Sequence, residues 1–279
     1  MIIDFHTHIF PPQMRENRER YLERDRTFGV LYSDPRARMA TAENLIVVMD
    51  EDGVDTSVAM GIGWSDYDTA REANDYIIEA VRGSQGRIVG FAGINPAWGD
   101  RAAREAERCA ESGLRGIGEL HPDTQEFDLA DKGTMAGLMT VAEERSLIVT
   151  THSSEPVGHP YTGKGSVTPQ VLMQFISNFP EATIVCAHWG GGLPFYALMP
   201  EVADALRNVY FDSAASPFLY TPQVYSAMSG LVGAEKLLLG SDYALIRPRR
   251  LLDELAASSL TLQEREALLG GNAARLLGI

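Results

Sequence analysis

The sequence has 279 residues, of which 45% are hydrophobic and 22% charged, which fits one large α/β domain better than two small ones. The formal net charge is −14 with a pI near 4.8, and no lysine or arginine stripe occurs, so we expect neither nucleic acid nor a membrane as a partner. The first nine residues lack the basic leader of a secretion signal, and Cys109 and Cys186 are interpreted as buried free thiols, so we expect a cytoplasmic protein.

Short apolar runs alternate with helical patterns from one end of the chain to the other. Each run has the length and the β-branched content of a buried strand. We predict strands at residues 1–6, 55–61, 87–94, 114–120, 147–152, 183–188, 208–213 and 236–242.

Helical patterns fill the stretches between the predicted strands. The clearest pattern covers 68–82, with Asp68 as the predicted N-cap, and a second covers 100–113. Near the carboxyl end, Thr261 and Glu264 make a capping box that opens another helix, and 272–277 is predicted as a last short helix.

Strands that alternate with helices imply parallel pairing through right-handed crossovers, and this many units favour a closed barrel over an open sheet. We therefore predict a single α/β domain over residues 1–279 with the (β/α)8 TIM-barrel fold. Residues 10–40 and 153–167 break the alternation after the first and fifth strands. Because barrel enzymes build their active sites from such loops, both segments are expected near the site.

Histidine and aspartate residues recur at the predicted carboxyl ends of the strands. His6 and His8 end the first strand and, two residues apart, share one face. Others follow at the ends of the fifth, sixth and eighth strands, namely His152, His188 and Asp242. The pattern predicts one metal centre at the mouth of the barrel.

Each of these residues has an alternative role without a metal. His152 can be a core histidine, Asp242 can cap the next helix, and His188 can belong to a turn before the glycines that follow it. The recurrence at matching strand ends favours the metal centre.

Imidazole and carboxylate ligands suit Zn2+ best, with Mn2+, Fe2+ or Co2+ as alternatives. Three histidines and one aspartate leave a position for water, whose pKa a bound metal lowers to about 7. His188 is interpreted as a general acid or base in preference to a ligand, and Asp242 is also placed to move a proton.

Longer stretches that include these residues resemble the amidohydrolase superfamily, in its amidohydrolase-related branch, which holds hydrolases and aminocarboxymuconate semialdehyde decarboxylase-like enzymes. The matching stretches span the chain in the family's order, at residues 3–8 (IDFHTH), 116–122 (GIGELHP), 151–152 (TH), 187–191 (AHWGG), 240–243 (GSDY) and 271–277 (GNAARLL). The resemblance implies a barrel of the metal-dependent hydrolase type in which His6, His8, His152 and Asp242 bind one catalytic metal.

The chain departs from this branch at Glu119, where many relatives carry lysine. Because two-metal members of the superfamily place a bridging carboxylate at that strand end, Glu119 can bridge a second metal together with His152 and His188. A structural ion pair of Glu119 with a base such as Arg115 is the alternative.

Residues that contact the substrate are expected in the loops. The segment 153–167 carries His159, Tyr161 and Lys164 beside the predicted centre, and Arg247 follows the last metal ligand. Because a small carboxylate substrate needs a cation, Arg247 is the candidate substrate-binding residue.

Two reactions agree with this site. A hydrolase would use metal-bound hydroxide against a small amide, ester or lactone, whereas the alternative, a decarboxylase, would remove carbon dioxide from an unsaturated or aromatic acid. A second metal at Glu119 would favour hydrolysis, and a basic residue inside a closed pocket would favour decarboxylation. A non-catalytic metal-binding scaffold is disfavoured because it needs no open position beside a base. Analogy with relatives suggests a homodimer.

Overall fold

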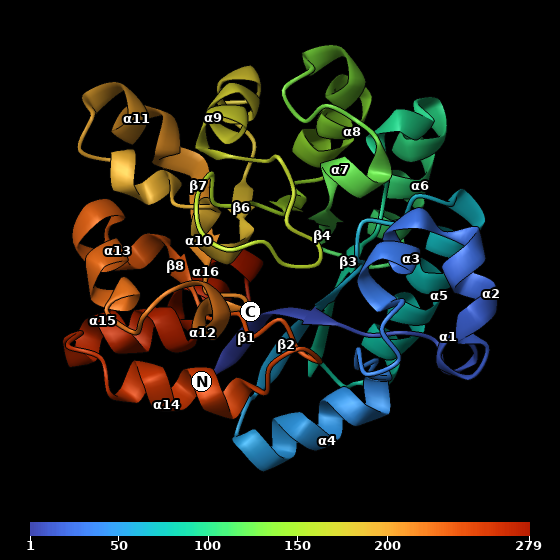
Figure 1. Ribbon diagram of the computed structural model, residues 1–279, viewed down its shortest axis with the longest axis horizontal. Helices are drawn as coiled ribbons and strands as arrows, with labels where there is room; N and C mark the ends of the chain where they lie inside the picture. Colours follow the sequence, from blue (N-terminus) through green and yellow to red (C-terminus); the bar gives the residue numbers. More distant parts are fainter.

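The computed structural model describes all residues 1–279, and its strands form one sheet in which each strand pairs in parallel with the next (Figure 1). In chain order the strands are β1 (Ile3–His8), β2 (Thr56–Met60), β3 (Ile88–Ala92), β4 (Gly116–Leu120), β5 (Ile148–Thr151), β6 (Ile184–Cys186), β7 (Val209–Asp212) and β8 (Leu237–Leu238). All eight fall inside the strand ranges predicted from the sequence, apart from the last two residues of β1.

The sheet closes on itself where β8 meets β1. The backbone N–H of Phe5 donates to Leu239 O at 2.7 Å, and the N–H of Asp242 donates to His6 O at 2.8 Å. A third bond joins His8 N to Tyr243 O at 2.7 Å. Eight parallel strands closed in this way, with helices between them, form the predicted (β/α)8 barrel.

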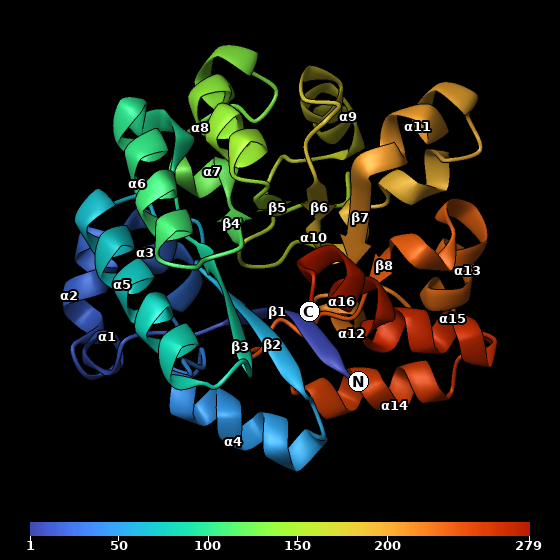
Figure 2. The same ribbon diagram turned by 180° about the vertical axis from the view of Figure 1, so that it is seen from behind.

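One helix after each strand packs around the barrel, as Figure 2 shows from behind. These outer helices are α4 (Ala42–Asp52), α5 (Tyr67–Gly83), α6 (Asp100–Glu111), α8 (Lys132–Glu144), α9 (Pro169–Asn178), α11 (Pro200–Ala205), α13 (Val224–Val232) and α14 (Pro248–Ala256). Because helices cover the outside and side chains fill the inside, nearly every strand residue is buried.

Shorter helices occupy the connecting loops and the carboxyl end. They are α1 (Pro12–Glu16), α2 (Arg18–Arg24), α3 (Arg26–Tyr32), α7 (Pro122–Gln125), α10 (Ala187–Gly190), α12 (Ser216–Leu219), α15 (Leu262–Glu266) and α16 (Asn272–Leu277). The long segment after β1 is therefore a packed subdomain, and its Phe10 and Phe28 form a small buried cluster with Trp64. No helix combines the length and the apolar character needed to cross a membrane.

Helix caps agree with the sequence prediction in one place and differ in another. Thr261 and Glu264 form the predicted capping box of α15. The predicted N-cap Asp68 is wrong, because the side chain of Asp66 accepts the N–H of Thr69 and Asp68 already lies in the first turn of α5. Asp66 has the extended backbone of an N-cap residue.

Candidate metal centre

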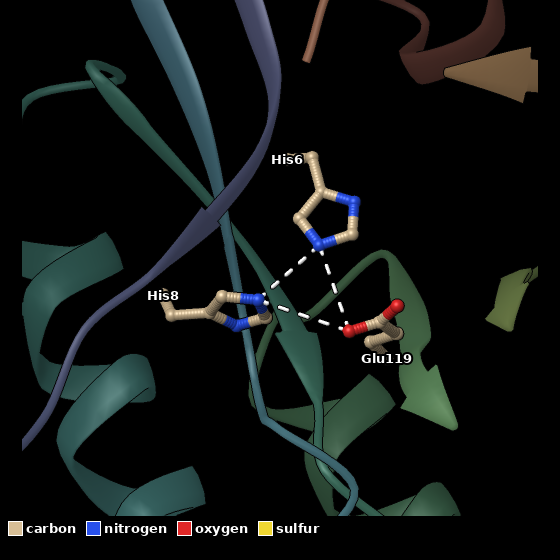
Figure 3. A group of neighbouring side chains, drawn as sticks. All are labelled: His6, His8 and Glu119. Carbon is tan, nitrogen blue, oxygen red and sulfur yellow. Dashed lines mark hydrogen bonds and ion pairs between the residues drawn. The ribbon is translucent and has the colours of Figure 1, made fainter. Parts of the chain in front are cut away.

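Two histidines at the end of β1 face a glutamate at the end of β4 (Figure 3). The Nε2 atoms of His6 and His8 lie 3.2 Å apart. Glu119 Oε2 lies 3.7 Å from His6 Nε2 and 3.8 Å from His8 Nε2. All three side chains are buried. We call these three residues the first ligand group.

The other oxygen of Glu119 faces two further histidines, at the ends of β5 and β6. Glu119 Oε1 lies 3.0 Å from His152 Nδ1 and 3.2 Å from His188 Nε2. The two nitrogens are themselves 3.1 Å apart. We call Glu119, His152 and His188 the second ligand group, so that Glu119 belongs to both groups.

The position of Glu119 depends on the glycine before it. Gly118 has a φ of +148°, and a Cβ there would lie 2.8 Å from both Cβ and the backbone oxygen of Thr150 on β5. A side chain at Gly118 would push β4 away from β5. The glycine therefore lets β4 carry Glu119 to a point between the two groups of histidines.

Asp242 extends the first ligand group from the end of β8. Its Oδ1 lies 3.4 Å from His8 Nε2, and its side chain is 16% exposed, about twice the exposure of His8. The residue has a left-handed backbone with a φ of 63°. Asp4 supports this turn by accepting the N–H and the hydroxyl of Ser241 at 2.8 and 2.5 Å.

Carbonyl oxygens fix the protonation of two of the histidines. His8 Nδ1 lies 3.2 Å from Met60 O, and His188 Nδ1 lies 3.0 Å from Ala214 O. Because a carbonyl can only accept a hydrogen bond, Nδ1 carries the proton in both rings. The Nε2 atom of each ring is the one that faces the centre.

The remaining two histidines are held by side chains. His6 Nδ1 lies 2.9 Å from Asp212 Oδ2 at the end of β7. His152 presents Nδ1 to the centre, and its Nε2 lies 3.4 Å from the hydroxyl of Ser154. Each of the four imidazoles thus has one nitrogen fixed outside the centre and one inside.

The buried charges shift the pKa of the groups at the centre. Burial by itself would raise the pKa of Glu119, but the imidazoles of His152 and His6 hold it well below its usual range. Burial opposes protonation of His188, yet its hydrogen bond to Glu119 and the charge of Glu119 raise its pKa to about 9. The centre therefore attracts positive charge.

This set of donors fits divalent metal ions. Each ligand group brings buried imidazole nitrogens and a carboxylate oxygen within 4.8 Å of one another. Imidazole and carboxylate are the ligands of Zn2+ and of Mn2+, and a cation takes the place of the protons that otherwise neutralise such a cluster. The geometry supports one metal in each group, with Glu119 shared.

A cavity of about 430 Å3 opens over the centre. The end of α3, the loop 153–167 and the turns after β7 and β8 contribute to its walls. Aliphatic residues and one phenylalanine line it, namely Leu31, Ala37, Ile62, Ala215, Phe218, Leu219, Ala244 and Leu245. A small, largely apolar molecule would fit beside the ligands.

Two polar side chains from the segment after β1 also line this cavity. Arg38 makes no hydrogen bond or ion pair with another residue, so its guanidinium is free to meet a ligand. The ring of Tyr32 stacks on Phe28 with centroids 5.0 Å apart. Burial, followed by the charges of Asp242 and Glu119, raises the pKa of the Tyr32 phenol, which therefore stays protonated and can donate a hydrogen bond.

Of the substrate-contact candidates from the sequence, some line the cavity and others do not. His159 and Tyr161 of the loop 153–167 line the cavity, whereas Lys164 donates to the carbonyls of its own loop. Arg247 does not reach the cavity, because it pairs with Asp52 at 2.6 Å and with Glu51 at 2.8 Å on the outer surface. The structure therefore places Arg247 outside the cavity, away from the position expected for a substrate contact.

Sequence reasoning misses three residues of the site. Tyr32 and Arg38 lie in a segment whose fold has no clear periodic signal; Tyr32 ends α3, and Arg38 reaches the cavity from the loop that follows it. Asp212 lies in a predicted strand with no role predicted for it, although it ends β7 just as the ligand residues end their strands. Its position at the end of a strand is the feature of the sequence that could have identified it as a site residue.

Comparisons with known proteins agree with the fold. A search of curated proteins found no match. Among solved structures, the chain is similar to 5-carboxyvanillate decarboxylase from Sphingomonas paucimobilis, with 18% identity and a TM-score of 0.78 over 100% of this chain and 99% of that one.

Two further similar structures contain manganese. One is 5-carboxyvanillate decarboxylase from Novosphingobium aromaticivorans, with 17% identity and a TM-score of 0.79, covering 100% of this chain and 96% of that one. The other is a dihydroxybenzoic acid decarboxylase from Polaromonas, with 19% identity and a TM-score of 0.70, covering 99% and 96%. At these identities the likeness shows a shared fold.

The sequence profile of the amidohydrolase family matches residues 3–279, almost the entire chain. This range spans the positions of the two ligand groups and of Asp242. The chain therefore belongs to the amidohydrolase family.

Proposed function

We propose that this protein is a metal-dependent, non-oxidative decarboxylase of a small aromatic or unsaturated carboxylic acid. The observation that carries the proposal is Arg38, an unpaired cation on the wall of an otherwise largely apolar cavity beside the ligand groups. The solved structures described above that share the fold bear the names of decarboxylases of aromatic acids, which supports this choice over the hydrolase expected first.

The side chains of the cavity suit the binding of such an acid. Arg38 attracts the anion and holds an oxygen by a charged hydrogen bond, while Tyr32 donates from its protonated phenol. Apolar side chains such as Leu31 and Phe218 contact the ring. They also favour release of carbon dioxide, because the product is neutral and the reactant carboxylate is not.

The reaction replaces a carboxylate with a proton. The bond between the ring carbon and the carboxylate breaks, its electron pair remains on the carbon, and one proton is added there as carbon dioxide leaves. Bound divalent metal would supply positive charge that holds substrate oxygens and offsets the charge that develops. Asp242 adjoins the cavity, and so does His188, whose Nε2 is available when no second ion occupies it; these are the groups that we propose hold the proton and deliver it.

The metal is part of the proposal. His6, His8, Glu119 and Asp242 would hold the first ion, and Glu119, His152 and His188 would hold a second, so that Glu119 is shared. Zn2+ is the expectation from the donor types, and Mn2+ suits a set with two carboxylates equally well. Manganese is present in two of the similar structures.

The direct test is an assay of aromatic acids with hydroxyl substituents, with Mn2+ or Zn2+ supplied, in which carbon dioxide and the decarboxylated product are both measured. Arg38→Met should raise KM about 10- to 100-fold, because a hydrogen bond to a charged group contributes about 1.5–3 kcal/mol. Arg36→Met is the matched control, since Arg36 is 89% exposed and pairs with Asp34 on the same loop. Turnover of esters or lactones, with no acid decarboxylated, would refute the decarboxylase.

Hydrolysis is the second candidate, and Glu119 is the observation that favours it. A carboxylate shared by two ligand groups matches a two-metal centre, in which two bound ions would lower the pKa of water for attack on a carbonyl. In that reaction a water oxygen would add to the carbonyl carbon of an ester, lactone or amide, the bond from that carbon to the leaving oxygen or nitrogen would break, and the leaving atom would take the proton that the water gives up.

Metal content per chain separates the one-metal and the two-metal centre. If Glu119 bridges two ions, elemental analysis of the wild type should give two metals per chain and Glu119→Ala should hold at most one. Glu155→Gln, a change in the neighbouring loop outside both ligand groups, should leave the content unchanged. A single metal that survives the loss of Glu119 would make Glu119 structural and would remove the main support for hydrolysis.

A further inference from the structure

Asp212 is a buried carboxylate that contacts both ligand groups without belonging to either. It lies at the end of β7, and its side chain is fully buried. Its Oδ2 lies 2.9 Å from His6 Nδ1. Its Oδ1 accepts the backbone N–H of His188 and the backbone N–H of Ala214, each at 3.0 Å.

The contact with His6 decides which nitrogen of that ring faces the centre. An ionised carboxylate can only accept hydrogen bonds, so His6 Nδ1 carries a proton that it donates to Asp212. The lone pair for a metal is then on Nε2, which lies 3.2 Å from His8 Nε2 and 3.7 Å from Glu119 Oε2.

His8 provides an internal comparison. Its Nδ1 also donates outward, but to the neutral carbonyl of Met60 at 3.2 Å. A carboxylate acceptor is charged and makes a shorter bond to His6, and such a partner increases the basicity of a ligating imidazole. The first ligand group has two histidines. Of these, His6 is therefore the one whose strength as a metal ligand depends more on a neighbouring side chain.

The second oxygen of Asp212 acts on the other ligand group through the backbone. His188 has a left-handed conformation with a φ of 55°, which is costly for a residue with a side chain. The bonds from His188 N and Ala214 N to Oδ1 hold this turn, and Ala214 O in turn accepts from His188 Nδ1. One carboxylate thus fixes a side chain in the first group and a backbone turn in the second.

We propose that Asp212 is the positioning residue of the metal centre, which keeps the proton of His6 on Nδ1 and joins the two ligand groups. The inference rests on the metal centre of the proposed function and does not depend on which reaction the centre performs.

The substitution Asp212→Asn isolates this role. The amide oxygen can still accept the N–H groups of His188 and Ala214, so the amide nitrogen then faces His6 Nδ1. Because an amide nitrogen only donates, His6 Nδ1 must accept and the proton must move to Nε2. The nitrogen that faces Glu119 and His8 would then carry a proton in place of a metal.

Asp25→Asn is the matched control. Asp25 is also fully buried, and it accepts three backbone N–H groups, from Phe28, Ser65 and Asp66, each at 2.8 Å. It contacts no histidine. Its replacement makes the same change of charge at a buried acceptor, so it measures the structural cost alone.

The experiment is a titration of metal-stripped, full-length protein with Zn2+ in competition with a chromophoric chelator. Asp212→Asn should lower the affinity for Zn2+ about 10- to 100-fold, and Asp25→Asn should leave it within about twofold of the wild type. Unfolding of the metal-free variants, followed by circular dichroism, should show similar losses of stability for both. Equal affinity in Asp212→Asn and wild type, or an equal loss in both variants, would overturn the inference.

A second measurement covers the case in which Asp212→Asn does not fold. In wild-type protein with 15N-labelled histidine and bound Zn2+, the His6 signals, identified by their loss in His6→Gln, should show a proton on Nδ1 and none on Nε2. A proton on Nε2 would overturn the inference. Failure of the wild type to bind Zn2+ would overturn the proposed function too, whereas the expected binding without turnover of any acid would count against the proposed function alone.

Discussion

At the scale of single residues, the site depends on how closely two loops approach. Gly191 has a φ of +55°, and a Cβ there would lie 2.5 Å from Ser154 O and 3.0 Å from Ser154 N. The hydroxyl of Ser154 is the neighbour of His152 Nε2. We expect Gly191→Ala to lower the free energy of unfolding by about 1–3 kcal/mol, because the backbone is strained and the loop must move. Urea unfolding measures the change.

The control for this substitution is Gly137→Ala. Gly137 lies in α8 and is exposed, and a methyl group added there would have no neighbouring atom within 4 Å. Alanine should raise the stability there by about 0.5–1 kcal/mol, because glycine is unfavourable inside a helix. Effects of the same sign at Gly137 and Gly191 would contradict the importance of the close approach.

At the scale of elements, a buried network of hydrogen bonds links α5 and α6 to the end of β3. Asn74 on α5 accepts from Gly93 N at 2.8 Å and donates to Glu105 on α6 at 3.0 Å. Glu105 also accepts from Arg108 at 2.7 Å. Burial by itself would raise the pKa of Glu105, but Arg108 and Asn74 hold it below its usual value.

This network should make the stability depend on pH. Because the pKa of Glu105 is lowered on folding from 4.5, its ionised form stabilises the protein above that value, and the contribution is lost as the pH falls below it. Glu105→Gln should therefore cost about 1–3 kcal/mol at about pH 7 and much less at about pH 3.5, in urea unfolding at both values. A cost independent of pH would show that the charge of Glu105 does not matter.

At the scale of the whole molecule, the carboxyl-terminal helix closes the end of the barrel opposite the metal centre. Figure 2 shows α16 beside the start of β1. Ala273 and Leu277 of α16 are buried with Ile3 and Phe5 of β1. Asn272 donates to two carbonyl oxygens, that of Ala234, which precedes β8, and that of Leu237, which is the first residue of β8.

Removal of residues 272–279 should therefore abolish cooperative folding or lower the free energy of unfolding by more than about 4 kcal/mol. Loss of one buried leucine side chain alone costs about 2–5 kcal/mol. Thermal unfolding followed by circular dichroism tests this, with Ile279→Ala as the control, since Ile279 is 50% exposed. A truncated chain as stable as the control would show that the barrel closes without α16.

The sequence predicts the parts of the molecule that depend on local periodicity. Buried strands and amphipathic helices leave a repeating pattern, so all eight strands are found, and the barrel follows from their alternation. The predicted ends of β6 and β8 lie too late in the chain, because His188 and Asp242 take left-handed backbones that depend on tertiary hydrogen bonds.

Side chains that reach the site through loop packing could not be predicted. Arg247 follows a ligand in sequence, but Asp52 at the end of α4 draws it to the surface. Arg38 is distant from every predicted ligand in sequence and reaches the cavity through the fold of the segment after β1. Distance along the chain carries no information about such contacts.

The spread of the ligands along the chain has a consequence for biosynthesis. The first proposed ligands, His6 and His8, leave the ribosome early in the synthesis of this domain, and Asp242 leaves near its end. A nascent chain that stops before β8 has an incomplete ligand set and an open barrel edge. Only a polypeptide that has been translated through β8 would therefore bind the metal with full affinity.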